Sequence, residues 1–487
     1  MLLGELLTKA GYAVPAGSEG IGISGIYTHS AKVREGGLFV AIRGLSEDGF
    51  CHLDEAILRG AAFVVTERPV SLLPSLAVKD ARVALARLFN AWYDDPTKNM
   101  KLIGITGTNG KTSTAAMLAS ILEGGGVRCG VIGTVECRCC GEVLHTEAEN
   151  ELANMTTPDP AALYGVLAQM RDRGVTHVVM EVTSHALHFS RVEPLLFERA
   201  VFTNLTPDHL DLHGDMSAYF AEKRKLFCQS KMAIISLFSS FGQVLADSLD
   251  IPFYTVEKNT LRKVKTASSD GISFELFWQG ALLPISLPVV GGFNVENAAL
   301  AATTALSLGI EPLAVVEALA NYRGVKGRME KLPNTGDIDV YIDYAHTPDA
   351  LEKLLLCTRE MRREGQRITL VFGCGGNRDR LKRRKMGSIA SRLADFTIIT
   401  SDNCRDEHPD AVIAEILKGV DKEKPYHVVP DRCAAITYAI QNARAGDIIL
   451  LAGKGHEEYE ICGGARLPFS ERRIVAACIE ERGGRLK

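Results

Sequence analysis

Short apolar runs alternate with amphipathic segments along the chain, a pattern typical of strands and helices in α/β folds. In the first part, Leu38–Ile42 and Ala62–Val65 predict buried strands, and Asp54–Arg59 predicts a helix between them. The Asp-Pro pair that opens residues 95–99 indicates a linker. We therefore expect a first domain over residues 1–98.

Residues 99–327 predict a second domain, a parallel sheet with helices on both faces. The expected strands are Lys101–Ile105, His177–Glu181 and Arg199–Phe202, and the expected helices are Thr112–Glu123, Leu163–Arg173 and Ser217–Phe227. Such alternation is typical of nucleotide-binding folds.

Residues 328–487 repeat the alternation and predict a third domain of the doubly wound, Rossmann-like kind. Its expected strands are Val340–Ile342, Ile368–Phe372, Phe396–Thr400, His427–Val429 and Ile448–Ala452. The chain is thus predicted to be an α/β protein of three domains.

Composition and charge agree with a globular protein that acts on small molecules. The 487 residues are 46% hydrophobic and 23% charged, with a formal net charge of −4. This charge provides no overall basic field for nucleic acid or an anionic membrane. Glu5 lies where a secretory signal carries bases, and no apolar run reaches the ~18 residues that a membrane span needs. We expect a cytoplasmic monomer with no nucleic acid partner and no membrane insertion.

The 12 cysteines are scattered, which favours reduced thiols over a disulfide framework. Cys137, Cys139 and Cys140 form the one cluster. A zinc site normally needs a second ligand pair at a distance, and none follows with suitable spacing. Exposed thiols on a turn are the expected structure, with metal binding as the alternative.

The most specific local motif is Thr106–Ser113, between an expected strand and an expected helix. Its candidate phosphate-binding residues are Gly107, Thr108, Asn109, Gly110, Lys111, Thr112 and Ser113. Glycines let backbone N–H groups approach phosphate oxygens, Lys111 supplies a cation, and Thr112 is a candidate Mg²⁺ ligand. The general phosphate-loop pattern has Gly where this chain has Ile105, so a generic kinase or GTPase fits poorly.

Two residues near the expected sheet edge are candidate metal ligands. Glu181 ends a strand beside the phosphate loop, and His209 follows the next strand. Taken alone, a histidine such as His209 more often caps a helix or bonds at the surface. Lys223 lies among Glu222, Arg224 and Lys225, and these neighbours alone predict a solvated basic face.

Motifs in all three parts, taken together, resemble those of the Mur ligases. The matching segments are Thr106–Ser113, Met155–Pro160, Glu181–Leu187, Phe202–His213, Gly292–Asn297, Gly327–Glu330, Asp343–Leu351, Phe372–Asp379 and Ala452–Glu457. The resemblance implies a domain for a uridine nucleotide, a central ATPase domain and a C-terminal domain for an incoming amino acid. It also implies that closure of the domains assembles the site.

The resemblance assigns substrates and cofactors to residues of this chain. The expected ATP ligands are the phosphate loop with Asn294, Asn297, Arg328 and Asp343. The expected ligands of the UDP-linked muramoyl dipeptide are Ser30, Thr156, Thr157, Ser184 and Arg191. Mg²⁺ is expected on Thr112, Glu181, His209 and Lys223, the last as a carbamate formed with CO₂, because a carbamate ligates this cation as a carboxylate does.

The resemblance further implies a peptidoglycan-precursor reaction in which ATP turns a D-glutamate side-chain carboxylate into an acyl phosphate. An amino acid then attacks it. Members that use meso-diaminopimelate carry Asp-Asn-Pro-Arg in the acceptor loop, where this chain has Asp402, Asn403, Cys404 and Arg405. A guanidinium holds the second carboxylate of diaminopimelate in bidentate fashion. The other expected acceptor ligands are Arg378, Gly453 and Glu457.

Alternatives remain at this stage. L-lysine is the second candidate acceptor, since Cys404 replaces the family's proline. A related ligase of the folylpolyglutamate kind and a nucleotide-binding regulatory module without turnover are the rival functions. His29 and Ala31, at the position of an Asp-Ser-Arg sequence, and Phe189, at a common glutamine position, depart from the family pattern.

Overall fold

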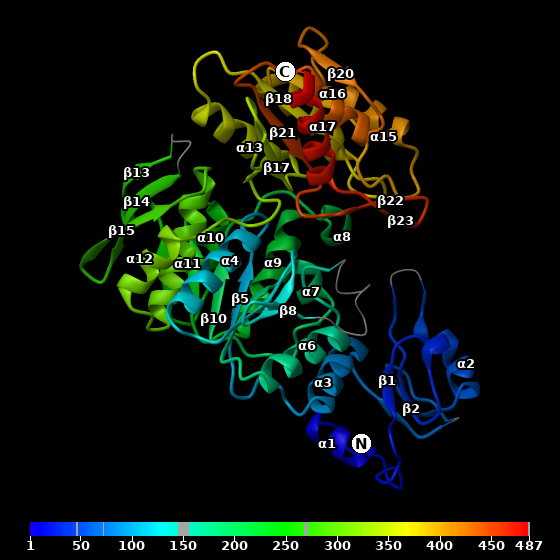
Figure 1. Ribbon diagram of the computed structural model, residues 1–487. Helices are drawn as coiled ribbons and strands as arrows, with labels where there is room; N and C mark the ends of the chain where they lie inside the picture. The colour runs from blue at the N-terminus through cyan, green and yellow to red at the C-terminus, as the bar shows by residue number, and fades with distance from the viewer. Residues whose placement is uncertain (45–46, 72, 145–154, 267–270, 486–487) are drawn as a thin grey trace.

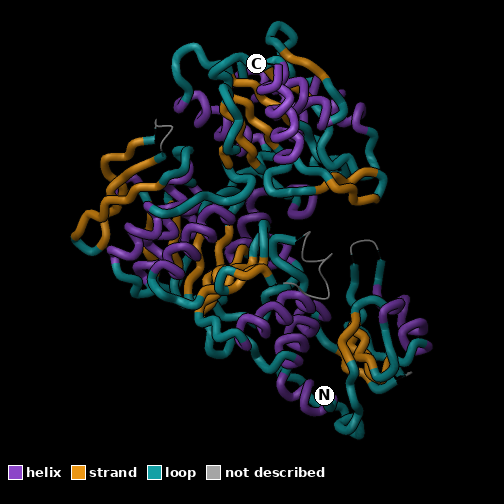
Figure 2. Tube along the Cα trace, in the orientation of Figure 1, coloured by secondary structure: helices purple, strands orange, loops and turns teal. Residues whose placement is uncertain are grey.

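The computed structural model describes residues 1–44, 47–71, 73–144, 155–266 and 271–485. Three parts follow one another along the chain, and each has its own main sheet (Figure 1). The N-terminal and C-terminal parts lie at opposite ends of the molecule, with the central sheet between them. Helices flank the strands in each part (Figure 2).

The N-terminal part is a four-stranded parallel sheet in the order β1-β2-β3-β4. Its strands are β1 (Gly25–Tyr27), β2 (Gly37–Val40), β3 (Ala61–Thr66) and β4 (Ser75–Ala77), and its helices are α1 (Leu3–Lys9), α2 (Leu53–Leu58) and α3 (Ala81–Trp92). The two predicted strands and the predicted helix are confirmed within two residues at each end. Helix α3 shares a hydrophobic core with the central part, which joins the two.

The central sheet has the order β12-β11-β10-β5-β9-β6-β7-β8, with β12 to β6 parallel and β7 and β8 antiparallel. The strands are β5 (Lys101–Thr106), β6 (Cys129–Ile132), β7 (Cys137–Cys139), β8 (Glu142–Val143), β9 (His177–Glu181), β10 (Arg199–Phe202), β11 (Ala233–Ser236) and β12 (Phe253–Val256). The helices are α4 (Lys111–Gly124), α6 (Pro160–Asp172), α7 (Ser184–His188), α8 (Leu210–His213), α9 (Met216–Cys228), α10 (Ser240–Asp247), α11 (Phe293–Ser307) and α12 (Pro312–Ala320). A small antiparallel sheet of β13 (Leu261–Lys265), β14 (Ile272–Trp278) and β15 (Ala281–Leu287) lies beside them.

Every predicted strand of the central part is confirmed. Ile105 pairs with Glu181 across β5 and β9, so the phosphate loop and the carboxylate leave the sheet at the same edge. Helices α4 and α11 pack on one face, while α6 and α9 contribute to the core of the other. Both faces are covered, as the continuous apolar strands require.

The expected turn at Cys137–Cys140 is wrong for most of its length. Cys137–Cys139 form strand β7, which pairs with β6, and Cys139 is buried. Only Cys140 is exposed, at a φ of +51° in the turn that follows. The segment gives no apolar run that would predict a strand, because the residue between the two cysteines is Arg138, which pairs with Glu123 of α4.

The C-terminal part has a six-stranded sheet in the order β16-β17-β21-β18-β19-β20, parallel except for β16. Its strands are β16 (Glu330–Lys331), β17 (Asp339–Asp343), β18 (Ile368–Phe372), β19 (Phe396–Ile399), β20 (Tyr426–Val428) and β21 (Ile448–Ala452), followed by the hairpin β22 (Tyr459–Cys462) and β23 (Ala465–Pro468). The helices are α13 (Pro348–Met361), α14 (Leu381–Leu393), α15 (Pro409–Leu417), α16 (Arg432–Gln441) and α17 (Glu471–Arg485). The predicted doubly wound arrangement is confirmed.

Candidate active site

The phosphate loop joins β5 to α4 in a conformation that needs glycine. Gly107 has a φ of +143°, and a Cβ there would lie 2.0 Å from Oγ1 of Thr203. Gly110 caps α4 at a φ of +86°. The Nζ of Lys111 donates to the carbonyl oxygens of Gly107 at 3.0 Å and Thr108 at 2.9 Å, which keeps the cation over the loop. Backbone N–H groups and one ammonium therefore converge where phosphate oxygens would bind.

Glu181 faces the first turn of α4. The Thr112 hydroxyl donates to Oε2 of Glu181 at 2.9 Å, and Thr134 donates to the same carboxylate through both its backbone N–H and its hydroxyl. Mg²⁺ is held by one or two protein oxygens plus phosphates and water in most nucleotide sites. The pair of Thr112 and Glu181 fits that donor set.

The environment of Lys223 differs most from the one that its sequence neighbours predict. The solvated basic face expected on α9 is wrong here, because Lys223 is only 2% exposed and its Nζ donates to the carbonyl oxygen of Gly107 at 2.8 Å. Burial, and then the charge of Lys111, hold the pKa of Lys223 well below its usual range. Its neighbours Arg224 and Lys225 are directed elsewhere, Lys225 to Glu222. Burial thus shifts the equilibrium of Lys223 toward the neutral amine.

His209 lies at the start of α8, at a φ of +54°. Burial is the main cause that lowers its pKa to about 4, so the imidazole is neutral at pH 7. Its Nε2 lies 3.4 Å from the carboxylate of Asp208, and its ring meets that of His185 edge-on. A neutral imidazole beside a carboxylate is able to ligate a metal or accept a proton.

Arg328 connects the C-terminal part to the phosphate loop. Its guanidinium donates to Oγ1 of Thr112 at 3.0 Å and lies over the ring of Tyr344. Asp343 accepts from the backbone N–H groups of Met329 and Ala345, and burial raises its pKa. Arg328 therefore reaches the central part, and Asp343 lines the same cavity.

The two expected asparagines are on α11 and face each other. Asn297 donates to Oδ1 of Asn294 at 3.2 Å, and Asn294 donates to the carbonyl oxygen of Val290. Asn297 also leaves no room for a side chain at Gly110 of the phosphate loop, since a Cβ there would lie 2.4 Å from its Oδ1. Asn297 is thus a close neighbour of the loop, with Asn294 behind it.

The residues expected to hold the muramoyl dipeptide are only partly brought together. Thr157 donates to the carbonyl oxygen of Glu181 at 2.8 Å, and Arg191 donates to that of Thr157 at 3.0 Å. The hydroxyl oxygens of Thr156 and Thr134 lie 3.0 Å apart. The expected ligands Ser184 and Ser30 are buried in other contacts: Ser184 bonds His213, and Ser30 donates to Glu55 in the N-terminal part.

Phe189, which departs from the family pattern, has a packing partner in this chain. The guanidinium of Arg82, from α3, lies 4.6 Å from the centre of its ring, and that of Arg191 lies 5.9 Å from it. A guanidinium is attracted to the face of an aromatic ring, an interaction that a glutamine at this position could not make. The ring thus links the N-terminal helix α3 to the arginine expected to bind the dipeptide.

The acceptor-loop residues surround one side of the same site. Arg405 donates to the carbonyl oxygens of Gly376 at 2.9 Å and Asn403 at 3.2 Å. Asn403 donates to Oε2 of Glu457 at 2.8 Å, and burial followed by Asp402 raises the pKa of Glu457. A guanidinium and a carboxylate therefore line the same cavity.

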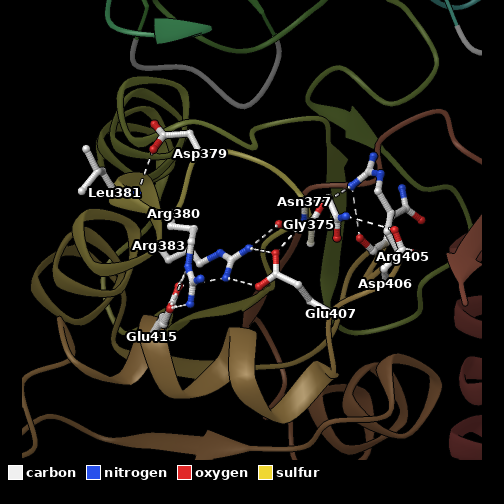
Figure 3. Close-up of polar contacts among 12 residues, drawn as sticks. Gly375, Asn377, Asp379, Arg380, Leu381, Arg383, Arg405, Asp406, Glu407 and Glu415 are labelled. Atoms are coloured by element: carbon white, nitrogen blue, oxygen red, sulfur yellow. Dashed lines mark hydrogen bonds and ion pairs between the residues drawn. The ribbon is translucent and has the colours of Figure 1, made fainter. Parts of the chain in front are cut away.

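Two supporting residues were missed from the sequence. Arg383 is completely buried and forms ion pairs with Glu407 and Glu415, and Glu407 in turn accepts from the backbone of Asn377 (Figure 3). Lys454 is also completely buried and donates to Oδ1 of Asn403 at 3.0 Å. The run Gly453-Lys454-Gly455 was the available signal for Lys454, whereas nothing local marks Arg383 among the other bases of α14.

Most of the named residues line one cavity of about 810 Å³ between the central and C-terminal parts. They are Thr108, Asn109, Gly110, Lys111, Thr112, Ser113, Thr156, Thr157, Glu181, Arg191, His209, Asn297, Arg328, Asp343, Arg378, Asp402, Asn403, Arg405, Gly453 and Glu457. Within the described chain, the expected residues outside its lining are Ser30, Gly107, Ser184, Lys223, Asn294 and Cys404. No cluster of three or more His, Cys, Asp or Glu side chains suited to a metal occurs among the described residues.

Sequence comparisons place the chain among proteins with these motifs. The Mur ligase middle domain matches residues 105–305, and the Mur ligase, glutamate ligase domain matches residues 327–455. A UDP-N-acetylmuramoyl-L-alanyl-D-glutamate--2,6-diaminopimelate ligase of Caldanaerobacter subterraneus subsp. tengcongensis is 42% identical over 96% of each chain. One of Clostridioides difficile with the same name is 38% identical, also over 96% of each chain.

A solved structure agrees over the full length. A structure of a UDP-N-acetylmuramoyl-L-alanyl-D-glutamate--2,6-diaminopimelate ligase superposes with a TM-score of 0.69 at 29% identity, covering 99% of this chain and 100% of the other. The family domains lie on the two parts that form the cavity. On this sequence and structural similarity, the chain belongs to the Mur ligase family.

Proposed function

We propose that this protein adds meso-diaminopimelate to UDP-N-acetylmuramoyl-L-alanyl-D-glutamate, with conversion of ATP to ADP and phosphate. The observation that carries the proposal is that Lys111, Thr112 and Arg405 line the same cavity. A phosphate cradle and a guanidinium suited to a carboxylate thus face a shared space of about 810 Å³. The names of the relatives at 38–42% identity support the same reaction.

Each part of the chain has a role in this proposal. Residues 1–98 hold the uridine end of the substrate, 99–327 bind ATP, and 328–487 present the amino acid. In the described chain no helix combines the length and the apolar character that crossing a bilayer requires. We propose a cytoplasmic monomer whose partners are its small-molecule substrates.

The first step activates a carboxylate that is inert toward amines at neutral pH. The D-glutamate side-chain carboxylate attacks the γ-phosphorus of ATP, and ADP leaves. Lys111 and the backbone N–H groups of the phosphate loop neutralise the charge that develops on the phosphate oxygens. Arg328, which reaches Thr112 from the C-terminal part, adds a second cation when the parts are together.

Mg²⁺ would be held by Thr112 and Glu181, with His209 nearby, and would supply charge neutralisation on the transferring phosphoryl group. Lys223 fits a carbamate because its environment favours the neutral amine that reacts with CO₂. The carbamate would add an anionic oxygen ligand close to Gly107, where Nζ now donates. Its role is to position a metal.

The second step is attack of the amino acid's amine on the acyl phosphate. Arg405 and Arg378 hold the second carboxylate of diaminopimelate, and Glu457 binds the distal ammonium. L-lysine lacks that carboxylate, so it would leave the half-buried guanidinium of Arg405 without an anionic partner. Burial and the nearby Arg378 already lower the pKa of Arg405, so an incoming carboxylate would relieve an unfavourable environment.

An ADP-release assay tests the proposal. Purified protein with ATP, Mg²⁺ and UDP-muramoyl dipeptide should release ADP with meso-diaminopimelate and at least ~100-fold less efficiently with L-lysine. Oxygen-18 in the D-glutamate carboxylate should appear in released phosphate. Turnover with lysine alone would overturn the acceptor assignment, and absence of the label from phosphate would overturn the acyl phosphate. ATPase activity that ignores both substrates would favour the regulatory alternative.

A further inference from the structure

Two cysteines of the acceptor region lie in direct contact. The Sγ atoms of Cys404 and Cys462 are 3.2 Å apart, and both residues are free thiols. Cys404 is in the acceptor loop between Asn403 and Arg405, while Cys462 ends strand β22 of the hairpin. The sequence gives no hint of this pair, because 57 residues separate the two positions along the chain.

The backbones on either side already hold these thiols together. The N–H of Arg405 donates to the carbonyl oxygen of Ile461 at 3.0 Å, and that of Gly463 donates to the carbonyl oxygen of Arg405 at 2.7 Å. Arg405 and Cys462 form a parallel bridge through these bonds. A covalent bond between Cys404 and Cys462 would therefore need only a further approach of roughly 1 Å between two segments that already lie side by side.

We propose that Cys404 and Cys462 form a reversible disulfide by exchange with a low-molecular-weight disulfide, and that this bond controls binding of the acceptor amino acid. The site is a redox modification site on the acceptor loop. The claim of control depends on the proposed function, whereas formation of the bond does not. Disulfides in a reducing compartment are typically transient and regulatory, as this one would be.

The accessibility of the two thiols sets the order of the exchange. Cys462 is exposed, whereas Cys404 is 3% exposed. Burial, followed by the contact with Cys462, raises the pKa of Cys404 to about 11. The thiolate of Cys462 therefore attacks first, forming a mixed disulfide and releasing one small thiol. Cys404 then loses its proton and attacks Sγ of Cys462, which releases the second small thiol, so two protein thiols are oxidised and one disulfide is reduced.

The bond would displace the residues that face the acceptor. Sulfur atoms in a disulfide are about 2.05 Å apart, so the two thiols must approach by roughly 1 Å. Cys404 lies between Asn403 and Arg405 in the chain, and Asn403 donates to Glu457. Asn403, Arg405 and Glu457 all line the cavity. Shifts of about 1 Å in binding groups are enough for large losses in activity. The oxidised protein should bind acceptor poorly while its phosphate loop remains unchanged.

The test combines peptide mapping with kinetics on the whole protein. Protein is incubated with reduced and oxidised glutathione at graded ratios, alkylated and digested with trypsin. The expected product is a cross-link between peptides 393–405 and 455–466, lost on treatment with dithiothreitol. Oxidation should raise the KM for diaminopimelate at least ~10-fold and leave the KM for ATP within about twofold.

Two serine variants complete the experiment. Cys462→Ser should have unchanged activity when reduced and should be insensitive to oxidised glutathione. Cys433→Ser, which removes another exposed thiol, should respond as the unmodified protein does. Alkylation of both Cys404 and Cys462 at every ratio would overturn the disulfide, and a cross-link without a change in acceptor KM would overturn its control of binding. If lysine proves to be the acceptor, the mapping is unaffected and the kinetics are measured with lysine.

Discussion

Lys223 and Lys111 donate to one and the same carbonyl oxygen, that of Gly107, at 2.8 Å and 3.0 Å. Burial makes it costly to charge either amine, and for Lys223 the charge of Lys111 adds repulsion. The pKa of each is lowered, and that of Lys223 falls well below its usual range. Helix α9 thus brings to the phosphate loop an amine whose equilibrium is shifted toward the neutral form.

Replacing Lys223 with Ala should lower turnover by roughly 100-fold, because the metal would lose a positioning ligand. ¹³C NMR of the protein in ¹³C-bicarbonate should show a carbamate carbon that is absent in Lys223→Ala. Lys225→Ala is the matched control, since Lys225 is on the same helix but pairs with Glu222 at the surface. Wild-type turnover in Lys223→Ala would refute the metal-positioning role.

Gly107→Ala should abolish ATP binding. An alanine Cβ would lie 2.0 Å from Oγ1 of Thr203 and 2.9 Å from the backbone oxygen of Asn204, so the loop must move. Gly126→Ala is the control: its φ is also positive, at +77°, but no atom lies within 4 Å of the added Cβ. Both variants carry a backbone penalty of about 1 kcal/mol.

Calorimetric titration with a non-hydrolysable ATP analogue separates the two effects. Gly126→Ala should bind the analogue normally with a slightly lower Tm, and Gly107→Ala should show no binding. Equal affinity in both variants would mean that the loop tolerates the displacement and that its shape is not what binds the phosphates.

The strands and the phosphate loop could be predicted because their signals are local. Apolar runs such as Ile368–Phe372 and Ile448–Ala452 predict buried parallel strands, and both strands occur with those bounds. Glycines at required φ angles mark the loop at Gly107 and Gly110. Periodicity and turn chemistry of this kind depend on neighbouring residues alone.

Lys223 and Arg383 could not be predicted from local pattern, because their burial is decided by partners far along the chain. Lys223 meets Gly107 across 116 positions, and Arg383 pairs with Glu407 from another element. Ser30 shows the opposite case: its motif position suggests substrate contact, yet its hydroxyl is donated to Glu55. The resemblance to a family supplied roles that sequence periodicity cannot, and those roles for individual residues stay predictions.

Glu407→Gln should destabilise the protein by about 1–3 kcal/mol at pH 7, because it removes one partner of the buried Arg383. Hydrogen bonding from Arg383, and then from the backbone of Asn377, lowers the pKa of Glu407 to about 2. A depressed carboxyl pKa contributes stability above the unfolded value of about 4.3 and loses it as the pH falls toward 2.

Calorimetry from pH 7 to pH 2 measures this dependence. The difference in Tm between the protein and Glu407→Gln should be largest above about pH 5 and should shrink as the carboxyl becomes protonated. Glu423→Gln, at an exposed turn position, should follow the unmodified protein at every pH. A Tm difference that stayed constant down to pH 2 would contradict the ion pair as its source.

Arg405→Ala should raise the KM for diaminopimelate by roughly 100-fold and leave the KM for ATP nearly unchanged, since only the acceptor loses a bidentate partner. Arg405→Lys keeps the charge but not the planar fork, so it should recover less than a tenth of the lost kcat/KM. Arg384→Ala, an exposed arginine of α14, is the control and should have no effect on either KM.

The comparison of acceptors decides what Arg405 recognises. If the guanidinium binds the second carboxylate, Arg405→Ala should narrow the preference for diaminopimelate over L-lysine, because lysine never used that contact. Arg405 also donates to the carbonyl oxygens of Gly376 and Asn403, so its loss loosens the loop as well. Loosening alone would weaken both amino acids equally and preserve the preference. An unchanged ratio of kcat/KM values would therefore assign Arg405 to positioning of the loop and leave recognition to Arg378.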